Sequence, residues 1–115
     1  MAVSSKLDVW RLAMDLAVEV HQLSDLLPGQ RRSDLADQLR RAAGSVPANI
    51  AEGNARRYRR DYLHFLAIAR GSLAELHTHL QLVRRLNQAP VADLDRIDAL
   101  HERVGQMLTR LIKSL

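Results

Sequence analysis

The sequence predicts an all-α protein, an up-and-down antiparallel four-helix bundle that forms one domain over residues 1–115. Glycine, proline and aromatic residues are scarce, whereas leucine, alanine and arginine, which favour helices, dominate. Apolar side chains recur every three or four residues in four segments, and no strand-like alternation competes with this pattern. Turn-forming residues between the segments predict helices over roughly 5–27, 33–53, 57–87 and 91–114.

The first two helices are separated by the sequence PGQRR at residues 28–32. The first helix carries an apolar stripe from Leu7 to Leu27 that includes Trp10. Ser33 suits the N-cap of the second helix because its hydroxyl can accept a hydrogen bond from a free backbone N–H. Gly53 suits the end of that helix because glycine adopts the left-handed conformation readily.

Pro47 lies inside the second helix, where it removes the hydrogen bond to the Ala43 carbonyl. We expect one continuous helix that is kinked near Pro47, with Gly44 easing the bend. Small residues surround the kink, and small residues let another helix approach closely. We therefore interpret Pro47 as a packing device and expect Gly71 and Ala74 of the third helix to match this surface.

The third helix has a coiled-coil-like seam that begins at Tyr62 and ends at Val83. The sequence NQAP at residues 87–90 ends it, and Pro90 suits the first turn of the fourth helix. The stripe of the fourth helix runs from Leu94 to Leu115. Because all connections are short, consecutive helices should be antiparallel neighbours.

Two polar rows interrupt the apolar stripes, one on each side of the expected contact between the second and third helices. We expect the rows to meet, because buried polar groups need partners, and we expect Arg40, Arg41 or Arg70 to neutralise the two glutamates. The alternative is that they line a binding pocket. The rows are Ser45, Asn49 and Glu52 on the second helix and Ser72, Glu75 and His79 on the third.

Composition excludes several classes of site. The chain has no cysteine, so it has no disulfide or thiolate metal site, which fits a reducing compartment. No apolar run is long enough to span a bilayer and the first residues lack the features of a signal peptide, so we expect a cytoplasmic protein. His77 and His79 are two residues apart on a helix and point in different directions, so they cannot share a metal ion. We find no catalytic set and no cofactor motif.

The strongest candidate binding site is the arginine cluster between the second and third helices. Fifteen of the seventeen basic residues are arginine, which matches phosphate and carboxylate groups well, although the net charge is only +4. An anionic partner would relieve the repulsion within the cluster, which Glu52 and Asp61 only moderate. That partner is either nucleic acid or an acidic patch on a neighbouring subunit. The residues assigned to nucleic-acid binding are Arg56, Arg57, Arg59 and Arg60, with Tyr58 and Tyr62 to stack on bases, and Arg40 and Arg41.

Two long motifs resemble one protein family. QLRRAAGSVPANIAEG (38–53) and DYLHFLAIARGSLAELHTHL (61–80) are similar to the motifs of the bacterial 23S rRNA intervening-sequence proteins, and they include Pro47, Asn49, Glu52, Gly53, Gly71 and Glu75. The first helix, with Trp10, is also similar. Residues 54–58 depart from the family pattern, which often has a serine there, so Asn54 is the nearest substitute for a serine cap on the third helix.

The resemblance implies a four-helix bundle that assembles into a ring, a homopentamer, with no known catalysis. A related group, the accessory proteins of diversity-generating retroelements, implies an alternative role as a scaffold for a reverse transcriptase. A weaker alternative is a ribonuclease, because Arg57 or Arg59 followed by His64 resembles the catalytic signature of the HEPN ribonucleases. That motif is short and common by chance in an arginine-rich helix.

Overall fold

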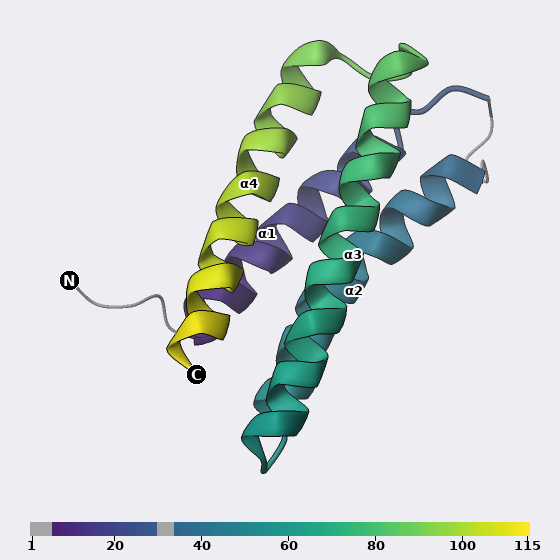
Figure 1. Cartoon of the computed structure of the whole chain (residues 1–115). Coiled ribbons are helices and arrows are strands. Elements are labelled where there is room, and N and C mark those ends of the chain that lie inside the picture. Colours follow the sequence, from purple (N-terminus) through teal and green to yellow (C-terminus); the bar gives the residue numbers. More distant parts are fainter. Residues whose placement is uncertain (1–5, 30–33) are drawn as a thin grey trace.

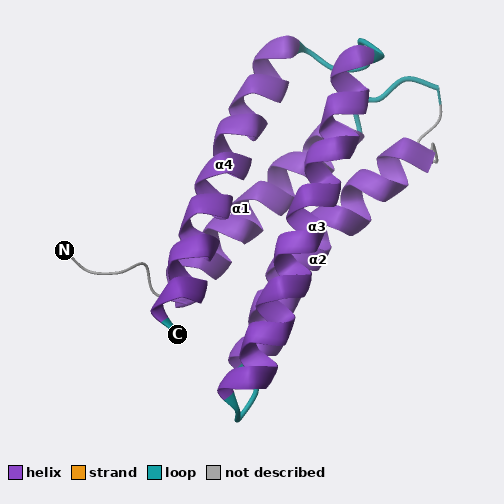
Figure 2. Cartoon of the chain, viewed as in Figure 1, coloured by secondary structure: helices purple, strands orange, loops and turns teal. Residues whose placement is uncertain are grey.

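The structure, a computed structural model, describes residues 6–29 and 34–115. It contains four helices, α1 (Lys6–Ser24), α2 (Asp34–Asn54), α3 (Arg59–Arg85) and α4 (Val91–Ser114), and no strand within the described residues (Figure 2). The predicted all-α four-helix fold is therefore confirmed. The predicted helix ends differ by up to three residues, and both residue 5 and the expected N-cap Ser33 lie outside the described residues.

Each helix packs against the helices next to it in the chain, and α1 also packs against α4. In Figure 1, α3 and α4 form the layer nearest the viewer, and α1 and α2 lie behind them. The apolar stripes of all four helices meet between these layers in one core. Its fully buried large side chains include Leu16, Leu39, Ile50, Leu66, Leu76, Leu94 and Leu108. Burying the stripes against one another is what holds the helices together.

The first helix ends earlier than predicted, at Ser24, although Leu27 beyond it is still buried. The Ser24 hydroxyl donates a hydrogen bond to the His21 carbonyl (2.7 Å) and accepts one from Arg40 on α2 (3.0 Å). Gly29 then takes a φ of 92°, a conformation that glycine adopts without strain. The apolar stripe therefore extends past the helix, because Leu27 fills the core from the turn.

Pro47 lies within a continuous α2, as predicted, and its ring is buried. Followed from the α2–α3 turn, α2 and α3 run side by side and then diverge, the arrangement expected if α2 bends in its middle (Figure 1). The prediction for Gly53 is wrong. Gly53 is a helical residue without positive φ, and α2 continues to Asn54.

The left-handed conformation that we assigned to Gly53 occurs instead at Asn87, after α3, with a φ of 55°. The Gln88 N–H donates to the Val83 carbonyl and the Asn87 N–H donates to the Arg84 carbonyl, both at 3.1 Å. These are the two hydrogen bonds of a Schellman motif, which satisfies the last carbonyls of a helix. Pro90 follows in extended conformation, and α4 begins directly after it at Val91.

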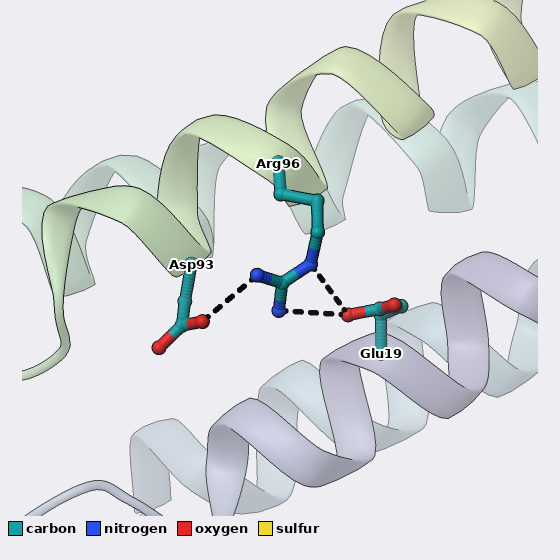
Figure 3. Close-up of polar contacts among 3 residues, drawn as sticks. All are labelled: Glu19, Asp93 and Arg96. Carbon is teal, nitrogen blue, oxygen red and sulfur yellow. Dashed lines mark hydrogen bonds and ion pairs between the residues drawn. The ribbon is translucent and has the colours of Figure 1, made fainter.

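Two arginines join neighbouring helices at the surface. Arg96 of α4 donates from Nε (3.1 Å) and Nη2 (3.0 Å) to Glu19 of α1, and from Nη1 (2.9 Å) to Asp93 (Figure 3). Arg84 at the end of α3 binds Asp98 (2.8 Å) and Asp95 (3.0 Å) of α4. These contacts fix α4 against both of its neighbours.

The polar rows of α2 and α3 meet only at one point. The Ser45 and Ser72 hydroxyls are 2.7 Å apart, and the Asn49 amide donates to the Ser45 carbonyl at 2.8 Å. The expected neutralisation by Arg40, Arg41 or Arg70 is wrong, because each glutamate pairs with a residue four positions further along the chain. Glu52 binds Arg56 and Glu75 lies 3.3 Å from His79.

The expected close packing of Gly71 and Ala74 against α2 is also wrong. Both residues are exposed, and a Cβ added at Gly71 would meet nothing within 4 Å. Ser72, one residue further along, is what faces α2, and a step of one residue turns a helix by about 100°. Gly71 therefore points away from that contact.

Candidate nucleic-acid interface

The arginine cluster occupies the turn between α2 and α3, at the lower end of the molecule in Figure 1. A Cβ built on Gly53 would lie 3.0 Å from Phe65 Cβ and 3.0 Å from Tyr62 Cδ1. No other residue leaves room for α3 at this position, so glycine lets the two helices come close just before the turn. The Arg56 N–H donates to the Gly53 carbonyl (3.0 Å), which closes the end of α2.

Tyr58, rather than the expected Asn54, is the residue before α3. It has an extended backbone (φ −106°, ψ 142°) and makes no capping hydrogen bond through its side chain. Asn54 belongs to the last turn of α2, so its predicted role as a cap on α3 is wrong. Asp61 in the first turn of α3 interacts favourably with the helix dipole.

Two of the four clustered arginines are held by the protein. Arg56 forms an ion pair with Glu52 (2.5 Å), and its guanidinium lies 4.6 Å from the centre of the Phe65 ring. Arg59 donates from Nε to the Leu115 carbonyl at the end of α4. These contacts direct both side chains along the surface of the subunit, and the pairing of Arg56 with Glu52 agrees with the sequence prediction.

The other two arginines extend into solvent. The Arg60 side chain is 91% exposed, and its Nε lies 3.9 Å from the carboxylate of its neighbour Asp61. Arg57 is also exposed and makes no ion pair with any described residue. The exposed pair of Arg60 and Asp61, at 3.9 Å, contributes little to stability. The guanidinium groups of Arg57 and Arg60 therefore remain available to a ligand.

The two tyrosines of the cluster differ in exposure. Tyr58 is 60% exposed, so its ring is open to a stacking partner. Tyr62 is buried in the core at 7% exposure, so the expected stacking role of Tyr62 is wrong. Its hydroxyl finds no hydrogen-bond partner within the described chain, and burial raises the pKa of Tyr62 above its usual value. The Lys6 ammonium lies 5.3 Å from the centre of the Tyr62 ring.

Arg40 and Arg41 lie apart from this cluster. Arg40 is 16 residues from Arg56, about 24 Å along a helix. Arg40 binds Asp37 of its own helix and Ser24 of α1, so it joins α1 to α2. Arg41 is exposed on α2. The sequence grouped these residues with the cluster, but the fold brings together only Arg56, Arg57, Arg59, Arg60 and Tyr58.

The histidines do not form a metal site with acidic residues anywhere in residues 6–29 and 34–115. His79 is buried whereas His77 is exposed, which agrees with the prediction that the two side chains point in different directions. The His77 and His101 rings are 5.4 Å apart, and His101 Nε2 lies 2.7 Å from the Leu73 carbonyl. His64, the residue of the ribonuclease hypothesis, is exposed, and its ring packs edge-on against Phe65 at 5.3 Å.

Sequence reasoning missed Phe65 and Leu115 as the residues that hold Arg56 and Arg59. The contact with Leu115 joins residues 56 positions apart, and no spacing pattern predicts it. Phe65 belongs to the motif DYLHFLAIARGSLAELHTHL, and nothing in that motif predicts its contact with the Arg56 guanidinium. Of the helices within the described residues, none is both long and apolar enough to cross a membrane.

The model of the family described as 23S rRNA-intervening sequence protein matches residues 5–110. The fold is similar to the crystal structure of a protein with unknown function from the S23 ribosomal protein family of Bacteroides thetaiotaomicron VPI-5482. The TM-score is 0.87 at 24% sequence identity, covering 94% of this chain and 97% of that chain. At this identity, the likeness supports the fold alone. No curated protein matches the sequence.

Proposed function

Because the chain belongs to the 23S rRNA-intervening sequence protein family, we propose that it is a non-enzymatic, homo-oligomeric protein. We propose that it binds RNA or DNA without sequence specificity through the α2–α3 turn. The observation that carries the proposal is the pair of solvent-directed arginines, Arg57 and Arg60, on either side of the exposed Tyr58.

The chemistry of the turn fits a phosphate backbone better than a neutral partner. A guanidinium offers a planar set of donors that matches two phosphate oxygens at once. Tyr58 between the arginines offers a ring on which an unpaired base can stack, an interaction that tolerates any base. Glu52 is occupied by Arg56 and does not compete for Arg57 and Arg60, and the Asp61 carboxylate, 3.9 Å from the exposed Arg60 Nε, competes only weakly.

Assembly would strengthen a weak site. The resemblance implies a ring, a homopentamer, and five copies of a chain with net charge +4 carry +20. Several identical turns on one particle would contact one nucleic-acid strand at several points, and linked contacts bind far more tightly than a single contact. The mild charge of one chain is therefore compatible with useful affinity for nucleic acid.

Salt dependence tests the proposal directly. Binding of the full chain to a mixed-sequence single-stranded RNA would be measured over a series of salt concentrations. Each phosphate contact contributes a slope of about −0.7 to the plot of log K against log salt concentration. We expect the Arg57→Ser/Arg60→Ser variant to lose about 1.4 from the slope for each bound subunit.

A matched control removes the same charge elsewhere. Arg85 and Arg103 are exposed on α3 and α4 and make no ion pair with any described residue. We expect the Arg85→Ser/Arg103→Ser variant to retain the slope of the unsubstituted protein. Equal slopes for both double variants would contradict the proposal, because the arginines would then act only through net charge.

A further inference from the structure

We propose that His77 of α3 and His101 of α4 together bind one divalent transition-metal ion, of the type of Zn²⁺, in the cleft between these helices. The inference goes beyond the proposed function, because the site lies far from the arginine cluster. His77 is 17 residues from Arg60, about 26 Å along α3. The ion would join the two helices that form the front layer in Figure 1.

The two histidines come from different helices and meet only in the fold. The centres of their rings are 5.4 Å apart, and the ring planes are inclined by 41°. Both side chains line one cleft of about 710 Å³ between α3 and α4, together with the small residues Ala74 and Gly105. In the sequence His77 is close to His79, which points elsewhere. Spacing along the chain therefore does not reveal the pair.

The ring of His101 is already oriented as a metal ligand. Its Nε2 lies 2.7 Å from the Leu73 carbonyl oxygen. A carbonyl oxygen only accepts hydrogen bonds, so Nε2 carries the proton in this contact. In the neutral ring, the lone pair that can bind a metal is therefore on Nδ1. Histidines that bind metals usually donate their other N–H to a carbonyl or a carboxylate, which fixes the tautomer and the ring. Leu73 provides this contact.

His77 can supply the second nitrogen. Its side chain is exposed, and its ring nitrogens form no hydrogen bond with any residue in the described part of the chain. Turning the ring about its side-chain bonds therefore breaks no polar contact. The nitrogen that faces His101 is free to bind a metal ion.

The separation of the two rings fits a shared ion. A ring nitrogen lies about 1.2 Å from the centre of an imidazole and about 2.1 Å from a bound zinc ion, so tetrahedral zinc would hold two ring centres about 5.3 Å apart. The rings of His77 and His101 are 5.4 Å apart. Binding would thus require rotation of side chains and no movement of α3 relative to α4.

The protein supplies two ligands and not a closed set. Among residues 6–29 and 34–115, no group of three or more histidine and acidic side chains is arranged to hold a metal ion. Water would complete the four positions that zinc prefers. Imidazole suits Zn²⁺, Cu²⁺ and Ni²⁺, whereas Mg²⁺ and Ca²⁺ prefer oxygen ligands. The site should therefore bind transition metals with moderate affinity and leave positions open to another ligand.

Charge in the cleft favours a cation. Asp98 and Glu102 line the cleft with the two histidines, whereas Arg70 and Arg110 line only its continuation toward the other end. Glu102 is exposed and forms no ion pair with any described residue. Asp98 is paired with Arg84 at 2.8 Å. One carboxylate beside the rings therefore remains without a neutralising cation, and its field attracts positive ions.

The first test titrates the full chain, free of any histidine tag, with Zn²⁺ in a calorimeter. We expect one ion per subunit at micromolar affinity, and affinity weaker by roughly tenfold or more in His77→Ala. This variant should fold, because His77 is exposed. His64→Ala is the matched control, since it removes another exposed histidine of α3, and it should bind Zn²⁺ as the unsubstituted protein does. Mg²⁺ should not bind at the site.

The other outcomes of this titration would overturn the inference. Equal affinity in His77→Ala and the unsubstituted protein would show that His77 is not a ligand. The same loss in His64→Ala would show that Zn²⁺ binds to surface histidines in general. Arg57→Ser/Arg60→Ser should bind Zn²⁺ normally, so the inference does not depend on the proposed binding of nucleic acid.

The second test identifies the ligands by nuclear magnetic resonance of the ¹⁵N-labelled histidine rings. Without metal, we expect His101 to be in the form protonated at Nε2. Addition of Zn²⁺ should shift the ring signals of His77 and His101 and leave those of the other three histidines in place. A form of His101 protonated at Nδ1, or shifts confined to other histidines, would disprove the proposed site. The histidines that should not respond are His21, His64 and His79.

Discussion

At the scale of single residues, the contact between α2 and α3 depends on Gly53 and Tyr62. The aromatic ring of Tyr62 fills the space that a side chain at position 53 would need, and its buried hydroxyl has no hydrogen-bond partner among residues 6–29 and 34–115. Sequence reasoning recognised both residues but assigned Gly53 to a helix end and Tyr62 partly to base stacking. Their actual roles depend on the distance between two helices, which a one-dimensional pattern does not contain.

Two glycine substitutions separate close packing from open space. We expect Gly53→Ala to lower the free energy of unfolding by about 1–3 kcal/mol, because the added methyl group overlaps Phe65 and Tyr62. Gly71→Ala is the matched control. It should raise the free energy of unfolding by about 0.5–1 kcal/mol, since alanine is the better helix former and its methyl group meets nothing. Urea unfolding measures both, and similar effects at the two positions would contradict this account.

Tyr62 gives a dependence on pH. Burial raises its pKa, so the neutral form is favoured in the folded protein. Its contribution to stability is complete below the unfolded pKa of about 10 and is lost as pH rises through the higher folded pKa. We expect the free energy of unfolding to fall less between pH 9 and 11 in Tyr62→Phe than in the unsubstituted protein. Parallel pH profiles would show that Tyr62 does not ionise in this range.

At the scale of helices, α4 is attached through arginines as well as through its apolar stripe. Hydrogen bonds from Arg84 to Asp98 and Asp95, and from Arg96 to Glu19 and Asp93, raise the pKa of both arginines. Arg96 of α4 contacts Glu19 of α1, a residue 77 positions earlier in the sequence. The contact fixes how α4 lies along α1, because apolar stripes alone allow some sliding.

A double-mutant cycle measures this attachment. We expect Arg96→Ala and Glu19→Ala each to lower the melting temperature slightly, and the double variant to lose less than the two single effects together. The side chains are partly exposed, so added salt should reduce the coupling. An additive double variant would show that the pair in Figure 3 does not contribute to stability.

At the scale of the whole molecule, the protein separates its charged and apolar surfaces. The arginine cluster lies at the α2–α3 turn, whereas an apolar groove of about 490 Å³ lies between α1 and α2. The two surfaces can therefore serve different partners at the same time. Under the proposed function, the turn of each copy contacts nucleic acid while other faces hold the copies together.

The proposed assembly predicts a dependence on the length of the nucleic acid. We expect single-stranded RNA that is long enough to reach two turns of one particle to bind at least tenfold more tightly than RNA that reaches one. The gain should disappear in Arg57→Ser/Arg60→Ser and persist in Arg85→Ser/Arg103→Ser. Fluorescence anisotropy with a series of RNA lengths measures it. Affinity that rises only in proportion to length would argue against linked sites.

The sequence alone determined the number of helices, their order and most of the core, because apolar residues at helical spacing must be buried together. It also determined the family and the continuity of α2 through Pro47. Only the tertiary structure decided which polar groups meet, that Gly53 makes room for α3 while Gly71 faces open space, and which arginines remain free. The reason is physical. Periodicity fixes the direction in which a side chain leaves its own helix, whereas its partner depends on the distance, rotation and level of the neighbouring helix.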